Sequence, residues 1–434
     1  MRLTRSAMVL FVVFVFVALV PCPLLAGSTA NVLYNFDDIG GVGYYPVGGL
    51  ILDKAGNLYG TTSFANATGC GASGCGNIFK LMPNGDGTWT EKVLYTFCSL
   101  TNCADGDQPV AALIFDAQGN LYGTTAAGGT GTGCKQGCGT VFELTPNNDG
   151  TWSEKVLYSF SNNGTDGYFP EAAVVFDAKG NLYSTTPFGG NRAYRGCEYQ
   201  GCGTVFELSP TSGGTWTETI IHRFRFHGKN GLHGLYPYGG VIFDQNGNLY
   251  GQTDGGGAYD YQGTVYELVH RGHVWTEKVL HSFGKGNDGR GAASGLTIDP
   301  KGNLYGTTVF GGAYGGGIAF KLKPMGGRWH EQILHSFSNK KDGSQLFDAL
   351  ILDASGNVYG TTASGGTYNG GVVFELTPTA NGRWKERTLL DLNFNGAYGC
   401  IPLDGVTMDS SGHLYGTGNQ GGTYGYGTVF EVTP

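Results

Sequence analysis

The chain is built from short apolar runs separated by turn residues, and no helical period competes with this pattern after the N-terminus. In one representative stretch, β-branched and aromatic residues form four runs, at 112–116, 120–125, 140–145 and 151–160. Each run is short and is bounded by Gly, Asn, Asp or Pro, which favour turns. The pattern therefore predicts four antiparallel strands, with tight hairpin turns after the first and the third.

The same stretch recurs seven times along the chain. A Gly-Asn-Leu-Tyr-Gly phrase, with small variations, marks each copy, and a phrase related to Gly-Thr-Val-Phe-Glu-Leu follows it. The intervals between successive tyrosines are 63, 61, 67, 55, 54 and 56 residues, for Tyr59, Tyr122, Tyr183, Tyr250, Tyr305, Tyr359 and Tyr415. Seven units of four antiparallel strands are typical of a seven-bladed β-propeller. We expect this all-β fold, as a single domain, over 31–434.

The two ends of the repeat region predict how the ring closes. Six units end in a strand that begins with tryptophan, whereas the seventh unit stops at Pro434, after its third strand. The missing fourth-strand phrase occurs at 32–36, before any first strand. A ring explains this displacement, because the N-terminal strand completes the last blade and leaves no bare edge there. An open solenoid does not.

The first thirty residues follow the three-part plan of a secretory signal peptide. Two arginines precede an apolar run at 7–20, and Pro21 and small residues follow it. We expect cleavage after Ala30, with Ala26 as the second candidate, and a protein that is secreted or displayed at the cell surface. The alternatives are an uncleaved anchor, which the prolines interrupt, and lipidation of Cys22, which Pro21 fits poorly. No membrane insertion is expected after cleavage.

Composition limits the class of partner. Glycine accounts for 78 of 434 residues and charged residues for 14%, while aromatic residues make up 13% and are spread through the predicted strands. Because the strands contain enough apolar side chains for a core, we interpret the glycines as turn residues rather than as a sign of disorder. The net charge of −8 comes without a basic stripe, which argues against nucleic acid as a partner. We expect a monomer.

Eight cysteines form four local pairs, which are Cys70 with Cys75, Cys98 with Cys103, Cys134 with Cys138, and Cys197 with Cys202. Zinc sites use convergent sets of ligands, usually with two residues between paired cysteines. The spacings here are wider and the pairs lie in different stretches, so small disulfide loops in an oxidising compartment are the favoured interpretation. Cys400 is left over, as a free thiol, a buried residue or a point of attachment. We expect no cofactor or metal site, with calcium at Asp105 and Asp107 as the alternative to a solvated loop.

The repeated phrases D-x-x-G-N-L-Y-G-T-T, G-T-V-F-E-L-T-P and W-x-E-x-x-L-Y-S-F resemble the GloVer tandem repeat of exported bacterial proteins with varied anchors. The resemblance covers essentially everything after the signal peptide. It implies an exported, β-propeller-like repeat protein and brings no catalytic residues with it. The chain departs from the anchored pattern because it ends at Pro434 without a hydrophobic or sorting tail, which we interpret as release or an N-terminal tether.

Strand alternation predicts which face of the ring to search. The links from the second to the third strand, and from the fourth strand to the next blade, emerge on one face, which we call the loop face. The long loops and all four cysteine pairs fall there, and binding residues usually lie on such loops. Exposed rings beside polar groups suit sugars, whereas the alternative is that the tyrosines fill spaces between blades. The candidate ligand-binding residues are Tyr194, Tyr199, Arg225, His233, Tyr236, Tyr259, Tyr261, Tyr314, Tyr368 and Tyr424.

Residues repeated in every stretch, including the aspartates before the first hairpin turn and the tryptophans, are expected to maintain the fold. The sequence therefore favours a non-catalytic secreted or surface module that binds a glycan or a protein through the loop face. One alternative is an extracellular carbohydrate-active hydrolase or lyase, which would use Asp254, Asp260, Arg225 and His227. Another is a purely structural surface repeat protein.

Overall fold

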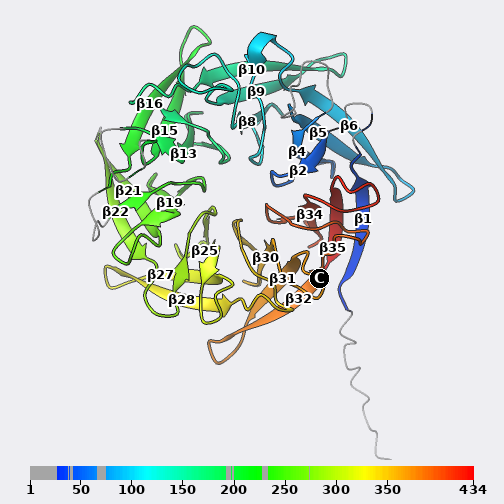
Figure 1. Ribbon diagram of the computed structural model, residues 1–434, viewed down its shortest axis with the longest axis vertical. Helices are drawn as coiled ribbons and strands as arrows, with labels where there is room; N and C mark the ends of the chain where they lie inside the picture. Colours follow the sequence, from blue (N-terminus) through cyan, green and yellow to red (C-terminus); the bar gives the residue numbers. More distant parts are fainter. Residues whose placement is uncertain are drawn as a thin grey trace, which may run out of the picture.

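The described residues form a ring of seven small antiparallel sheets around a central opening (Figure 1). The computed structural model describes residues 27–37, 39, 43–65, 75–191, 197, 200–226, 233–272 and 274–434. The seven-bladed, all-β propeller predicted from the repeats is confirmed. Within these ranges the one helical element is the short 3-10 turn η1 (Thr101–Cys103).

Each blade runs from a short inner strand to a long outer strand at the rim. The first three blades contain β3 (Ile51–Leu52), β4 (Leu58–Phe64), β5 (Asn77–Pro83) and β6 (Trp89–Thr96); β7 (Ile114–Phe115), β8 (Leu121–Thr125), β9 (Thr140–Pro146) and β10 (Trp152–Ser159); and β12 (Val175–Phe176), β13 (Leu182–Thr186), β15 (Thr204–Pro210) and β16 (Trp216–Arg223). The next three contain β18 (Ile242–Phe243), β19 (Leu249–Thr253), β21 (Thr264–Arg271) and β22 (Val274–Ser282); β24 (Thr297–Ile298), β25 (Leu304–Thr308), β27 (Ile318–Met325) and β28 (Arg328–Ser336); and β29 (Ile351–Leu352), β30 (Val358–Thr362), β31 (Val372–Pro378) and β32 (Trp384–Asp391).

The seventh blade joins the two ends of the chain. It contains β33 (Thr407–Met408), β34 (Leu414–Gly418), β35 (Thr428–Thr433) and, as its outer strand, the N-terminal β1 (Thr29–Asn35). β1 pairs antiparallel with β35, from Thr29 opposite Thr433 to Asn35 opposite Thr428 (Figure 1). The predicted closure is therefore present, and the strand begins three residues earlier than the phrase at 32–36.

The inner strands are shorter than the sequence pattern predicts. The pattern predicts a strand over 112–116, but only Ile114 and Phe115 pair in β7. The residues just before them, including Ala111 and Ala112, line the central channel instead. Because seven chain segments converge at the axis, the first part of each run faces its counterparts across the channel rather than a neighbouring strand.

A second ladder of backbone hydrogen bonds lies on the loop face of every blade. It joins the end of the link into a blade to the start of the loop after that blade's second strand. In the first blade β2 (Tyr44–Pro46) pairs with the end of β4, and in three others β11 (Gly167–Tyr168) pairs with β14 (Phe188–Gly189), β17 (Gly234–Leu235) with β20 (Gly255–Gly256), and β23 (Gly289–Arg290) with β26 (Phe310–Gly311). In the remaining blades, single bridges join Asp107 to Ala127, Ser344 to Ser364, and Cys400 to Gln420. The long loops are thus tied to the blades at their bases.

The core lies between neighbouring blades. A phenylalanine at the end of the outer strand in every blade except the sixth, where Leu392 replaces it, packs against an aromatic residue of the next blade's third strand, as Phe97 does edge-on against Phe142 with ring centroids 5.0 Å apart. Both rings are fully buried. The same contact recurs from Phe160 to Phe206 and from Phe283 to Phe320. Each blade therefore buries its apolar face only when its neighbour is present.

The repeated aspartates and tryptophans hold the fold, as expected. Asp116 Oδ1 accepts hydrogen bonds from the backbone N–H groups of Gln118 and Asn120, both at 2.9 Å, and its Oδ2 accepts one from the Tyr122 hydroxyl at 3.3 Å. Equivalent bonds recur in all seven blades. Trp275 packs edge-on against Tyr183 of the preceding blade, with ring centroids 6.4 Å apart.

Candidate functional site

Four tyrosines stand exposed at the same position of four successive blades. Each follows a Gly-Gly-x sequence in the loop between the second and third strands, on the loop face. Their exposed fractions are 40% for Tyr259, 70% for Tyr314, 56% for Tyr368 and 57% for Tyr424. We call these four residues the tyrosine row. Single exposed apolar side chains are common on protein surfaces, but a ring exposed at the same position of four blades is a candidate for contact with a ligand or partner.

Two other predicted tyrosines pack within the protein. Tyr236 lies edge-on to Phe188, with centroids 5.9 Å apart, and Tyr261 stacks on Phe226 at 5.4 Å. Both have positive φ angles of 60°, as expected where a loop turns sharply. These two rings therefore pack against other aromatic side chains and are less exposed than the four of the tyrosine row.

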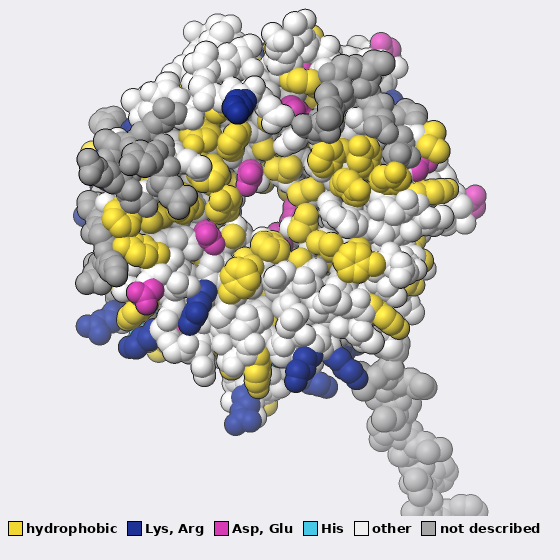
Figure 2. Space-filling model, in the orientation of Figure 1, with side chains coloured by type: hydrophobic (Ala, Val, Ile, Leu, Met, Phe, Trp, Pro, Cys, Tyr) yellow, Lys and Arg dark blue, Asp and Glu magenta, His cyan; other side chains and the backbone are white. Residues whose placement is uncertain are grey.

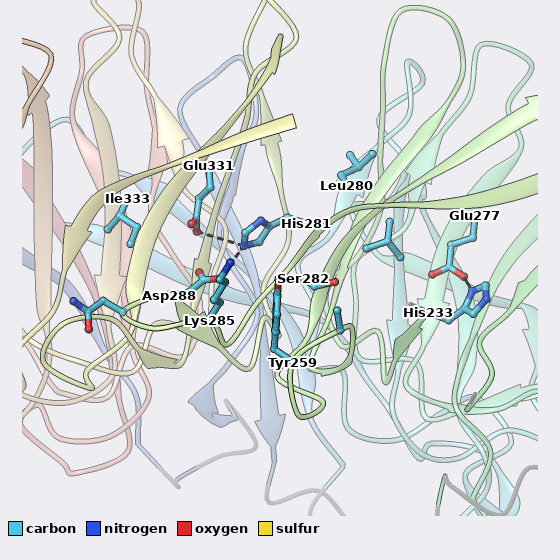
Figure 3. A pocket seen from close by; sticks show the side chains of 13 residues that line it. His233, Tyr259, Glu277, Leu280, His281, Ser282, Lys285, Asp288, Glu331 and Ile333 are labelled. Atoms are coloured by element: carbon cyan, nitrogen blue, oxygen red, sulfur yellow. Dashed lines mark hydrogen bonds and ion pairs between the residues drawn. The ribbon is translucent and has the colours of Figure 1, made fainter. Parts of the chain in front are cut away.

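A cavity of about 760 Å³ opens at the outer edge of the loop face, between the fourth and fifth blades. We call it the rim pocket. It brings together two of the predicted residues, His233 and Tyr259, with Lys285 and Ser282 (Figure 3). The Lys285 ammonium lies 5.9 Å from the centre of the Tyr259 ring, within the range of a cation–π contact. This volume is in the range of small-ligand sites.

Three ionisable side chains from two blades meet in the rim pocket. His281, on β22, points its Nε2 toward Asp288 Oδ2 at 3.0 Å and toward Glu331 Oε1, on β28, at 3.7 Å (Figure 3). The second oxygen of Asp288 accepts a hydrogen bond from the backbone N–H of Gly289 at 2.6 Å. Burial, and then the neighbouring Asp288 carboxylate, raise the pKa of Glu331 to about 9.

A second polar group lies on the other side of the same pocket. Glu277 is almost wholly buried and contacts two histidines, with His222 Nε2 at 3.3 Å from its Oε2 and His233 bonded through Nδ1 to the same oxygen. Although burial raises the pKa of Glu277, hydrogen bonds from His222 and His233 outweigh it and lower that pKa to about 2. The hydrogen bond to Glu277 in turn raises the pKa of His233.

The same three positions form contacts between other blades. An outer-strand Tyr or His meets an acid from the following loop and a Glu of the next outer strand. Between the first and second blades, Asp105 accepts hydrogen bonds from the Tyr95 hydroxyl at 2.8 Å and the Ser99 N–H at 2.9 Å. Burial, and then Asp105, raise the pKa of Glu154 to about 8. Asp105 and Asp107 are buried, so the interpretation of this pair as a solvated loop is wrong.

The central channel is a second cavity, of about 730 Å³, lined by equivalent residues of all seven blades. The face seen in Figure 2 has apolar side chains around the opening, with acidic side chains among them. The residues at one position of each blade are Val47, Val110, Glu171, Tyr238, Ala293, Phe347 and Leu403. Burial, and then Asp404, raise the pKa of Asp348 well above its usual range, while Asp404 accepts a hydrogen bond from the Gly49 N–H.

The residues nominated for catalysis do not share one cavity among the described parts of the chain. Asp254 lines the central channel, where burial raises its pKa. Asp260 is exposed in the loop next to Tyr259, and Arg225 is exposed near the link into the fourth blade. His227, Tyr194 and Tyr199 lie outside the described residues.

The predicted disulfides are present where the structure describes both cysteines. Cys98 is bonded to Cys103, Cys134 to Cys138, and Cys197 to Cys202. Cys75 is also disulfide-bonded, and Cys70 lies outside the described residues. Cys400 is a free thiol that is fully buried, where its backbone forms the bridge with Gln420.

The aligned repeats contained a signal for the rim pocket and the channel. His281 and Glu331 occupy the Tyr and Glu positions of the W-x-E-x-x-L-Y phrase, one blade apart, and Asp288 precedes a glycine as Asp105 and Asp166 do. In each link between blades, the residue that lines the channel comes directly after a position that is proline in most of the repeats. Reading columns across the repeats, instead of motifs along the chain, would have found both sets.

Comparison with known proteins places the repeat in a family. The model of the Gloeobacter/Verrucomicrobia repeat matches three overlapping segments, 23–197, 73–298 and 193–430. The chain belongs to the Gloeobacter/Verrucomicrobia repeat family. This confirms the resemblance seen in the phrases. No curated protein matches this family member.

Solved structures support the fold of this Gloeobacter/Verrucomicrobia repeat protein. A candidate 6-phosphogluconolactonase from Bacteroides uniformis superposes with a TM-score of 0.50 at 13% sequence identity, covering 82% of this chain and 86% of that one. At this identity the likeness concerns the fold alone. Separately, the part of the chain that the structure describes contains no helix long and apolar enough to cross a membrane.

Proposed function

We propose that this repeat protein is an exported, non-catalytic module that binds a glycan chain along the tyrosine row. The observation that carries the proposal is the exposure of Tyr259, Tyr314, Tyr368 and Tyr424 at one position of four neighbouring blades. Aromatic faces stack on the C–H faces of sugars while nearby polar groups bond the hydroxyls. A row that repeats from blade to blade suits a ligand that is itself a repeating polymer.

The surroundings of the row support a polar ligand. Thr367 precedes Tyr368 in the sequence, and its hydroxyl donates a hydrogen bond to Asp391 at 3.1 Å. The Asp391 carboxylate therefore lies at the edge of the loop that carries Tyr368. Lys285 lies against Tyr259. Rings that alternate with charged groups offer both stacking and hydrogen bonding to one ligand.

Export is supported by the N-terminal segment and by the cysteines. Three described disulfides, each within a short loop, form and persist in oxidising compartments. Polysaccharides are also the abundant polymers outside a cell. The hydrolase or lyase alternative has less support, because Asp254 lines the channel whereas Asp260 belongs to an exposed loop.

The test is binding of the purified chain to a glycan array, followed by titration of the best ligand. The triple variant Tyr314→Ala, Tyr368→Ala, Tyr424→Ala should lose at least about tenfold in affinity, because stacking of each ring contributes about 0.5–1.5 kcal/mol. The corresponding Phe variants retain the rings and should bind nearly as well. Met325→Ala, at a 57% exposed residue at the end of β27 on the opposite face, is the matched control. Equal affinity of the triple Ala variant and the control, or no bound glycan, would overturn the proposal.

A further inference from the structure

We propose that His281, Asp288 and Glu331 form a binding site for one divalent transition-metal ion, zinc in the first place, within the rim pocket. The three side chains come from the outer strand of the fourth blade, the link that follows it and the outer strand of the fifth blade. They point toward one another in Figure 3. The site does not depend on the proposed glycan binding.

The spacing of the three donor atoms fits a tetrahedral ion. Zinc holds nitrogen and oxygen ligands at about 2.0–2.2 Å, which places neighbouring donors about 3.3–3.6 Å apart. His281 Nε2 lies 3.0 Å from Asp288 Oδ2 and 3.7 Å from Glu331 Oε1. All three donor atoms lie within 4.8 Å of one another. The two distances from His281 therefore lie within a few tenths of an ångström of the spacing that a tetrahedral ion needs.

Burial and access also favour an ion at this place. The side chains of Asp288 and Glu331 are only 7% and 17% exposed. Two buried carboxylates within 4.8 Å of one another repel when both are ionised, and a cation between them removes that repulsion. The rim pocket opens on the same three residues, which provides an entry path and room for water as a fourth ligand.

Corresponding positions between other blades explain why this interface is distinct. Between the first and second blades, and between the second and third, a tyrosine hydroxyl stands in place of the imidazole. A neutral phenol is a poor ligand for zinc, whereas a neutral imidazole is a good one. Between the fifth and sixth blades His335 and Asp342 lie 3.0 Å apart, but the Thr388 hydroxyl donates a hydrogen bond to Glu386 Oε1 and occupies that oxygen.

The donor set also selects the class of metal. Calcium takes six to eight oxygen ligands, and magnesium keeps several waters in an octahedral shell. One imidazole and two carboxylates with an open position suit zinc and its neighbours in the transition series. The three ligands are divided between two blades and the link that joins them, so they form no short motif along the sequence.

The test is calorimetric titration of the EDTA-treated full chain with zinc chloride, checked by metal analysis after dialysis. The wild type should bind one zinc ion, and His281→Gln and Glu331→Gln should each weaken binding at least about tenfold. His335→Gln changes the equivalent histidine of the next interface and should bind as the wild type does. His233→Gln changes the histidine on Glu277 across the pocket and should also bind normally.

Cobalt provides a second readout that reports the ligands directly. Cobalt bound at the site should give visible absorption typical of four-coordinate geometry in the wild type and in His335→Gln, and none in His281→Gln. A far-ultraviolet spectrum shows which variants are folded, and Glu331→Gln replaces His281→Gln if the latter does not fold. Absence of zinc binding by the wild type, or binding that His233→Gln removes and His281→Gln does not, would overturn the assignment.

Discussion

The Tyr398 hydroxyl donates a hydrogen bond to the backbone carbonyl of Ala30, 3.1 Å away and 368 positions earlier in the chain. Nearby, the Ser28 hydroxyl donates to the Leu389 carbonyl at 2.7 Å, on the outer strand of the sixth blade. In four other interfaces the positions of Tyr398 and Ala30 are held by an aspartate and a glutamate, as with Asp105 and Glu154. At the closure of the ring, a hydrogen bond from Tyr398 to the Ala30 carbonyl thus takes the place of the contact between two acids.

Removing the closing strand should open the ring. We expect deletion of 32–36 to lower the melting temperature, because β35 loses its outer partner and Phe36, which is fully buried, leaves the contact with Phe79. The single change Phe36→Ala should cost about 3–5 kcal/mol. Thermal unfolding followed by circular dichroism measures both effects. A chain that starts at Gly27 is the control and should melt as the longest form does; an unchanged melting temperature after the deletion would contradict closure by β1.

The extent of β1 bears on where the signal peptide is cut. Of the two predicted sites, cleavage after Ala30 would remove Thr29 and Ala30, which pair with Thr433 and Val432. Cleavage after Ala26 leaves β1 whole. We therefore predict that the mature protein, isolated from an expression host with a secretory pathway, begins at Gly27. Intact-mass measurement decides between the two, and a mass that begins at Asn31 would refute this choice.

The sequence was sufficient for the architecture because the information is repeated. Seven copies of one phrase define the strands and the hairpin turns, and the displaced phrase at 32–36 defines the closure. The predicted inner strands are too long, because an apolar run does not reveal which of its residues pair with a neighbouring strand and which line a channel. Ala111 and Ala112 are as compatible with a strand as Ile114 is.

The site was less accessible to sequence reasoning because its residues come from different blades. The exposed position of Tyr314 follows from its place in a Gly-rich loop, but the packing of Tyr261 on Phe226 depends on a neighbouring link. Likewise, nothing local to Glu331 indicates that His281 lies 3.7 Å away. Contacts across blades appear only when equivalent positions of successive repeats are compared, because no motif within one repeat contains both partners.

The buried contact of Glu277 should be the most sensitive of the polar contacts at the rim. Replacing Glu277 by Gln removes the charge that two histidines face, and we expect a loss of about 2–4 kcal/mol in the free energy of unfolding at pH 7. Denaturant titration measures it. Asp86→Asn, at an exposed turn, is the control and should leave the free energy of unfolding nearly unchanged.

The pH dependence of the Glu277 contribution has a definite sign. The pKa of Glu277 is about 2 in the folded protein and is depressed from the ordinary value near 4.5. A depressed carboxyl pKa stabilises the fold above the unfolded-state value, and that stabilisation is lost as the pH falls through the folded-state value. The difference in stability between wild type and Glu277→Gln should therefore shrink between pH 4.5 and about 2. A difference that stays constant over this range would contradict the charged contact.

The carboxyl pairs between the first and second blades, and between the second and third, predict that stability falls as the pH rises toward about 8. Burial raises the pKa of Glu154 to about 8 with Asp105 beside it, and that of Glu218 to about 8 with Asp166, Tyr158 and Arg223 near it. The folded protein then holds protons that the unfolded chain releases near the ordinary value of 4.5. Stability from these groups is complete below that value and is lost progressively as the pH rises toward 8.

We therefore expect the melting temperature of the wild type to fall between pH 5 and pH 9. The double variant Glu154→Gln, Glu218→Gln carries amides that mimic the protonated acids, so its melting temperature should fall less over the same range. Glu431→Gln, whose side chain bonds Tyr415 in the seventh blade, leaves both pairs intact and should keep the wild-type slope. Parallel curves for the double variant and the wild type would contradict this prediction. They would show that the two glutamates are ionised in the folded protein, as they are in the unfolded chain, so that replacing them does not change the number of protons taken up on folding.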